Sequence, residues 1–364
     1  MKIEGKQLEI SSIIIDLIPL SWLVLVFAKA KLIMPISSFN TNNYLSLDNS
    51  KCYRGIFALA VLFHHIAQET ENGIFLQFFT RVGYLAVAMF FFLSGYGLQK
   101  SYISKSNTYK NNFLLKRLPS IIIPYIIITL FYWLIYYCNG QVYSIVDFFK
   151  SIINGYPLTL YSWYIIYIII FYFVFWVLMM ICKKHFCLMI IGGITWNVLY
   201  IFFCRRMDYG EWWYNSSHLL IIGMFWATYE QKILKIIKKI YLLLMPLVWL
   251  SFIIAFQYKN KLARLMRIPK EFVAMFVAAL FVMGVIMIIL KLQIGNRLLC
   301  LLGAISLEIY ISQGLFVEIF RSKYLFIENE ILWCMSVIVC TITFSFFIHN
   351  FFKFILNKFR VIAL

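Results

Sequence analysis

Runs of about 20 mostly apolar residues recur along almost the whole chain, and this pattern limits the possible folds more than any other feature. Of the 364 residues, 63% are hydrophobic and only 13% are charged. A soluble domain is nearer half apolar and a quarter charged. An apolar run of this length can cross a bilayer as a helix, because a helix satisfies its own backbone hydrogen bonds there. We therefore expect an all-α protein, a polytopic transmembrane helical bundle.

About eleven spans are expected from these runs. The first, residues 10–28, contains Asp16 and Pro19, which are unusual in a signal peptide, so we expect a membrane helix there. The polar residues 37–51 would then form a linker. The ten further spans are expected at residues 54–70, 82–99, 118–138, 160–182, 187–204, 214–230, 240–257, 271–290, 297–320 and 331–352. No long polar stretch separates them, so any chemistry has to come from the membrane helices and their short loops.

The formal net charge of +18 is expected to fix the orientation of the chain in the membrane rather than to bind nucleic acid. Placing residues 100–117 inside puts most lysines and arginines inside, with the N-terminus outside and the C-terminus inside. The basic residues 259–270 then lie outside, against the rule. Two explanations remain open: either two spans there are misplaced, or this loop meets an anionic partner such as lipid head groups or a charged polymer.

The eight cysteines include no C-x-x-C pair, and most lie in or beside apolar runs. We expect free thiols that pack as small hydrophobic side chains, and no metal site.

Residues 52–68, CYRGIFALAVLFHHIAQ, place ionisable side chains inside an apolar segment. On a helix, Arg54 and His65 are about 16 Å apart and within about 20° of one face, whereas His64 points to another side. Glu69 lies one turn beyond His65, within side-chain reach. Ionisable groups inside a membrane segment are expensive and mark a functional site by default.

Four stretches in a fixed order carry a family resemblance. They are Arg54 and His65 with ten residues between them, GYLAVAMFFFLSGYGL at 83–98, KRLPSIIIPY at 116–125 and LGAISLEIYISQ at 302–313. Together they resemble the signatures of the acyltransferase-3 family of integral membrane acyltransferases, over roughly residues 50–355. The resemblance implies a ten-helix core after one extra helix. The expected units are the extra helix and linker (1–50), the acyltransferase-3-like membrane domain (51–355) and a cytoplasmic tail (356–364).

The family resemblance also implies a reaction. The protein would be an O-acyltransferase of a bacterial cytoplasmic membrane, moving an acetyl group from cytosolic acetyl-CoA to a hydroxyl of a cell-surface carbohydrate or its lipid-linked precursor. Imidazole, with an unperturbed pKa near 6.5, suits a base that takes the hydroxyl proton, so His65 is the candidate base. Arg54, Lys116 and Arg117 are candidates to hold the phosphates of acetyl-CoA at the cytoplasmic mouth.

Two carboxylates and one hydroxyl complete the candidate site. Glu69 is expected to orient His65, and Glu308, in a late span, needs a partner that Arg54 or His65 could provide. Ser94 is a candidate to hydrogen-bond the reacting groups. Gln313 stands where the family pattern commonly continues to a histidine, and it cannot serve as a base at neutral pH.

Other polar and aromatic residues have simpler explanations. The remaining histidines, His185, His218 and His349, lie near predicted span ends and are expected at the membrane interface. Trp163 and Tyr164 fit an interfacial aromatic belt.

Two other classes of function stay open. A transporter of a lipid-linked sugar would use Arg54, His65 and Glu308 as a substrate or proton path, and should show repeated topology and broken helices. A non-catalytic membrane partner in envelope polysaccharide assembly should tolerate the loss of His65.

Overall fold

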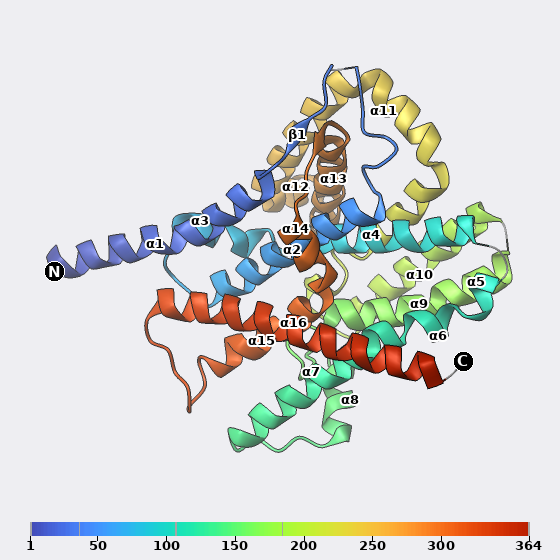
Figure 1. Ribbon diagram of the computed structural model, residues 1–364. Helices are drawn as coiled ribbons and strands as arrows, with labels where there is room; N and C mark the ends of the chain where they lie inside the picture. Colours follow the sequence, from blue (N-terminus) through green and yellow to red (C-terminus); the bar gives the residue numbers. More distant parts are fainter. Residues whose placement is uncertain (1, 36, 106–107, 184, 363–364) are drawn as a thin grey trace.

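The computed structural model describes residues 2–35, 37–105, 108–183 and 185–362. Within them the chain is almost entirely helical (Figure 1). The helices are α1 (Lys2–Phe27), α2 (Leu47–Gln68), α3 (Ile74–Phe78), η1 (Phe79–Arg81), α4 (Gly83–Ser104), α5 (Thr108–Asn111), α6 (Phe113–Arg117), α7 (Pro119–Cys138), α8 (Ile145–Ile153), α9 (Trp163–Cys182), α10 (Phe186–Arg206), η2 (Glu211–Trp213), α11 (His218–Gln257), α12 (Lys259–Met266), α13 (Lys270–Lys291), α14 (Arg297–Ala304), α15 (Ser306–Ile319) and α16 (Glu330–Ile362). Two short strands, β1 (Lys31–Leu32) and β2 (Leu292–Gln293), pair antiparallel.

The helices define a multi-pass integral membrane protein. Six of them in the described ranges are long and apolar enough to cross a membrane: α7, α9, α10, α11 with the residues before it, α13 and α16. Two bent pairs, α3–η1 with α4 and α14 with α15, raise the number to eight if each pair is one span.

The expected count of about eleven spans is not reached. In the part of α1 whose side chains the structure describes, the apolar stretch Ser12–Phe27 is shorter than a candidate span, and α2 is not among the candidate spans, since its polar residues offset its apolar ones. The expected spans 214–230 and 240–257 are counted as one candidate because they lie in one continuous helical element, α11, which bends into an arc (Figure 1). Its backbone is non-helical at Tyr229 and Ile240, close to the expected ends of the two spans.

Helix α2 lies in the middle of the bundle, beside α4 (Figure 1). From Cys52 to Ala67 every side chain is buried except those of Arg54 and His64, which are partly exposed. A helix that is apolar all round belongs in an interior. The bundle therefore surrounds the segment that carries both Arg54 and His65.

Asp16, the charged residue of the first apolar run, has a local structural role. Its Oδ1 accepts hydrogen bonds of 2.9 Å from the backbone N–H groups of Phe75 and Leu76 at the start of α3. The first N–H groups of a helix have no partner within the helix. Asp16 supplies one and so attaches α1 to the bundle.

A second attachment holds the linker before α2. Glu230 of α11 accepts hydrogen bonds of 2.8 Å from the hydroxyls of Tyr44 and Tyr96, and it also pairs with Lys100. Tyr44 in turn accepts a hydrogen bond from the indole N–H of Trp226. The linker is thus fixed against α4 and α11, which sets where α2 begins.

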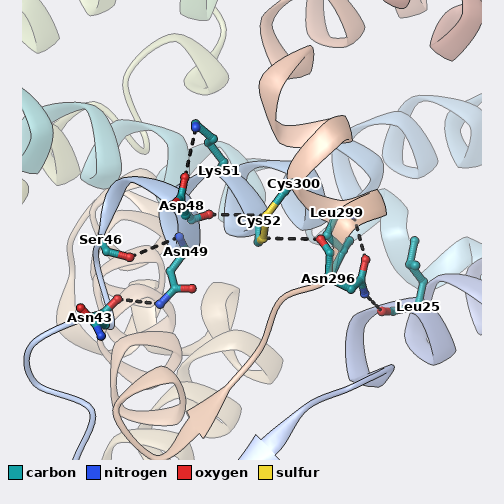
Figure 2. Close-up of a disulfide and its surroundings, with 10 residues drawn as sticks. All are labelled: Leu25, Asn43, Ser46, Asp48, Asn49, Lys51, Cys52, Asn296, Leu299 and Cys300. Atoms are coloured by element: carbon teal, nitrogen blue, oxygen red, sulfur yellow. Dashed lines mark hydrogen bonds and ion pairs between the residues drawn. A yellow bond between two sulfur atoms is a disulfide. The ribbon is translucent and has the colours of Figure 1, made fainter.

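Helices α2 and α14 are in direct backbone contact, and a disulfide joins them (Figure 2). A Cβ atom on Gly55 would overlap the carbonyl oxygen of Leu299, and one on Gly303 would overlap that of Lys51. The sequence-based expectation of free thiols is therefore wrong for Cys52 and Cys300, because the glycines bring the two helices close enough for the sulfurs to bond. The other six cysteines are free.

The Gly55 contact can be tested by a stability measurement. Gly55→Ala should lower the free energy of unfolding by about 1–3 kcal/mol, because the added methyl group meets backbone that cannot rotate away. The measurement is thermal unfolding of the purified protein in detergent. Gly97→Ala is the control, because its Cβ would have no heavy atom within 4 Å, and it should be neutral or slightly stabilising. Equal stability of the two variants would contradict the close packing of α2 on α14.

Candidate functional site

A cavity of about 670 Å³, here called the His65 cavity, lies beside the C-terminal end of α2. Its volume is in the range of small-molecule sites. Its lining comes from six parts of the chain: Val61, His64, His65 and Gln68 of α2; Thr80, Gly83, Tyr84 and Val87 of η1 and α4; Tyr136 of α7; residues 155–158 and 160–163; Glu211, Trp212 and Asn215; and Tyr310 of α15.

His65 is held in one orientation by its neighbour Gln68. Its Nδ1 lies 3.0 Å from Gln68 Oε1. An amide oxygen can only accept a hydrogen bond, so Nδ1 carries the proton and Nε2 of the neutral ring has a free lone pair. Glu69, the expected orienting carboxylate, is exposed, and no hydrogen bond to His65 is found for it in the described ranges. Its backbone N–H caps the end of α2 instead.

The ring of Tyr161 stacks on His65, with the ring centroids 3.5 Å apart and the planes within 18°. Tyr161 has a left-handed backbone, φ 61°, which is uncommon for a residue with a side chain and recurs at functional sites. Burial, with the nearby carboxylates of Glu69 and Glu318, raises the pKa of the Tyr161 hydroxyl, so the stacked ring is neutral. Gly314 of α15 makes room for this loop, because a Cβ there would meet both Leu160 and Tyr161.

His64 also lines this cavity, although helical geometry alone placed it elsewhere. Its Nδ1 lies 2.9 Å from the backbone oxygen of Phe79, and its ring centroid is 4.8 Å from that of His65. The cavity is wide enough at the end of α2 to be bordered by two successive residues. The expectation that His64 faces away from the site is therefore wrong.

A second cavity of about 420 Å³, the Arg54 cavity, lies at the other end of the buried part of α2. Four of the candidate residues, Arg54, Ser94, Arg117 and Glu308, line it. Lys116 does not, because it is an exposed residue on another side of α6. The guanidinium groups of Arg54 and Arg117 make the Arg54 cavity the cationic one of the two cavities. Ser94 contributes a hydroxyl, which lies 3.3 Å from the hydroxyl of Tyr164.

Glu308 pairs with His349 of α16, not with Arg54 or His65 as expected. Glu308 Oε1 lies 2.7 Å from His349 Nδ1. No ion pair joins Glu308 to Arg54 in the described part of the chain. Helix α16 packs next to α15 and brings His349 into the Arg54 cavity, a pairing that the sequence did not predict.

Tyr310 of α15 lines both cavities. Its ring packs edge-on against that of Tyr164, with centroids 5.3 Å apart. Tyr164 and the adjacent Trp163 are buried inside the bundle, so they do not form an interfacial belt. Gln313 is fully buried one turn further along α15, and its Nε2 donates a 3.1 Å hydrogen bond to the backbone oxygen of Tyr310. Gln313 is thus hydrogen-bonded to the backbone of Tyr310.

The basic residues 259–270 lie beside the His65 cavity. Lys259 of α12 is 5.9 Å from the ring centroid of Tyr84, and Lys270 lies 3.6 Å from Glu211; both Tyr84 and Glu211 line that cavity. Within the described residues, no group of three or more His, Cys, Asp or Glu side chains is arranged to hold a metal ion.

Sequence reasoning missed three residues of these sites. Gln68 carried no signal, since a glutamine near a helix end is ordinary. Tyr161 and His349 are far from α2 in the sequence, and only the packing of the bundle brings them to the two cavities.

The fold defines a multi-pass membrane protein with two cavities that share the lining residue Tyr310. A family profile described as an acyltransferase domain, Acyl_transf_3, matches residues 47–350. The chain therefore belongs to the acyltransferase-3 family, and this membership implies an acyltransferase. No curated protein and no solved structure matches the chain.

Proposed function

We propose that the protein transfers an acetyl group from acetyl-CoA in the Arg54 cavity to a hydroxyl of a carbohydrate, or of its lipid-linked precursor, in the His65 cavity. The observation that carries this proposal is the placement of His65. Its Nδ1 is engaged by Gln68, and its ring borders a cavity that shares the lining residue Tyr310 with the one lined by Arg54 and Arg117. The proposed setting is the cytoplasmic membrane of a bacterium.

The donor side is supported by charge. Arginine presents a planar fork of N–H donors that matches phosphate oxygens. Arg54 and Arg117 offer two such forks in one cavity. A CoA thioester bound with its phosphates at these arginines would direct its acyl end toward Tyr310. Ser94 and Tyr164, with their hydroxyls 3.3 Å apart, lie on the way.

The acceptor side is supported by the mixture of ring and amide groups in the His65 cavity. Tyr156 and Trp212 are 67% and 43% exposed, respectively, which leaves flat apolar surfaces free for a ligand. Gln68 and Asn215 add amides that can exchange hydrogen bonds with hydroxyls. The nearby α12 supplies positive charge for a phosphate of a lipid-linked acceptor.

The reaction then needs one proton transfer on the acceptor side. Nε2 of His65 takes the proton of the acceptor hydroxyl as the oxygen attacks the thioester carbon. The stacking on Tyr161 and the hydrogen bond from Nδ1 to Gln68 keep the His65 ring facing the cavity. The lone pair on Nε2 is therefore already oriented before the reaction begins.

The proposal can be tested with purified protein and acetyl-CoA labelled in the acetyl group. We expect labelled ester on an added envelope glycan fraction, or slow release of labelled acetate when acceptor is absent. A protein that binds a lipid-linked sugar but leaves the thioester intact would instead support a transporter or a non-catalytic partner.

A further inference from the structure

His349 and Glu308 form a buried histidine–carboxylate pair in the Arg54 cavity. Glu308 is 3% exposed, and its Oε1 lies 2.7 Å from His349 Nδ1. The second atom of each group, Oε2 of Glu308 and Nε2 of His349, is buried and has no hydrogen-bond partner in the described part of the chain. Buried polar atoms are almost always hydrogen-bonded. Two unpartnered atoms on one pair at a cavity wall therefore indicate that the pair meets a ligand.

The position of the pair fits the reacting end of the donor. Glu308 lies on α15 two residues before Tyr310, the residue shared by both cavities. Arg54 and Arg117 line the same cavity, so the pair shares its space with the groups proposed to hold the donor phosphates. None of the other described histidines lines this cavity. His349 is thus the imidazole available on the donor side of Tyr310.

We propose that His349 is the general acid that protonates the departing thiol of the acyl donor, with Glu308 holding its ring through Nδ1. This role rests on the proposed function. As the acceptor oxygen bonds to the acyl carbon, the carbon–sulfur bond breaks and its electron pair stays on sulfur. The proton on Nε2 of His349 moves to that sulfur and gives a neutral thiol. His65 gains the acceptor proton, and solvent exchange returns both histidines to their starting states.

The pair suits this step because its two nitrogens have separate tasks. Nδ1 is engaged by the carboxylate of Glu308. Nε2 has no hydrogen-bond partner in the described part of the chain, and it is the nitrogen assigned to the leaving thiol. At His65 the arrangement is similar, because Nδ1 is engaged by the amide of Gln68. In this proposal the ring held by the amide accepts a proton and the ring held by the carboxylate donates one, and each ring borders a different cavity.

The test compares two short acetyl thioesters that differ only in the leaving thiol. One is an alkyl thioester, acetyl-S-N-acetylcysteamine, and the other is an aryl thioester, S-phenyl thioacetate. An aryl thiolate is stable enough to leave without a proton. His349→Gln should therefore lower kcat/KM about 100-fold for the alkyl donor and less than about threefold for the aryl donor. His185→Gln, at an exposed histidine, is the control and should change neither.

A second measurement uses acetyl-CoA itself. His349→Ala should regain activity when imidazole is added, because removing the side chain leaves space for a diffusible acid in the cavity. Glu308→Gln should show a smaller loss with the same dependence on the leaving thiol, and it serves as the readout if His349→Gln does not fold. Equal losses with both thioesters and no recovery with imidazole would overturn the role of His349 while leaving the proposed function standing. A wild-type protein that consumes no thioester at all would overturn both.

Discussion

Replacing His65 by alanine should lower the rate of acyl transfer by about 10²- to 10⁴-fold, the usual contribution of a positioned general base. Among the described residues that line the His65 cavity, His65 is the imidazole with a ring nitrogen held by a side-chain hydrogen bond, and the change leaves a neutral, smaller residue in its place. Transfer is measured with labelled acetyl-CoA, and folding by thermal unfolding in detergent. His185→Ala is the matched control, since His185 is exposed at the start of α10.

Variants at Gln68 and His64 give two further tests of the role of His65. Gln68→Leu removes the acceptor for Nδ1 of His65, so it should cause a partial loss with the protein still folded. His64→Ala is not a neutral control, because His64 borders the same cavity and its ring lies against that of His65. Its effect should still be smaller than that of His65→Ala. If the His65 variant turns over at the wild-type rate, this histidine is not the base.

Replacing Arg54 by glutamine should weaken acetyl-CoA binding about tenfold to hundredfold, the loss expected for a charge-assisted hydrogen bond of about 1.5–3 kcal/mol. Arg54→Lys should also weaken it, because a lysine cannot reproduce the two-pronged contact with phosphate. Donor affinity is measured directly, for example by calorimetry. Lys116→Gln is the charge-matched control, because Lys116 is exposed outside the Arg54 cavity and should leave the affinity unchanged.

The competing explanation for Arg54 is a structural ion pair with Glu308. In the structure, Glu308 pairs with His349 instead. Glu308 should therefore keep its partner when the guanidinium of Arg54 is removed. Arg54→Gln should therefore keep most of the thermal stability of the wild type. A variant with normal donor affinity and a much lower unfolding temperature would assign Arg54 to the fold rather than to the donor.

The sequence was enough to predict the class of the protein and the family, because both depend on local patterns. Apolar runs of about 20 residues predict membrane helices one at a time, and the signature around Arg54 and His65 lies within one helix. The number of spans was less predictable. Whether two apolar runs make two helices or one bent helix depends on the residues between them, and in α11 these residues, including four lysines, stay helical.

The candidate site was predicted only where its residues are neighbours in the sequence or share the family pattern. Arg54, Ser94, Arg117 and Glu308 were candidates from the sequence, and the structure shows that they line one cavity. The partners of the two buried acid–base groups were not predictable. The choice between Gln68 and Glu69 for His65 depends on side-chain direction at the last turn of α2. The pairing of Glu308 with His349 joins residues 41 positions apart on two helices.

The place of Tyr310 in the lining of both cavities has a consequence for the energetics of crossing the bilayer. A nucleotide donor carries several negative charges, and moving even one charge through hydrocarbon is costly. If the donor phosphates stay at Arg54 and Arg117, as proposed, the donor never has to make that passage. In that arrangement only a small uncharged acyl group has to move from one cavity to the other. The membrane barrier would then be met by the part of the donor that is least sensitive to it.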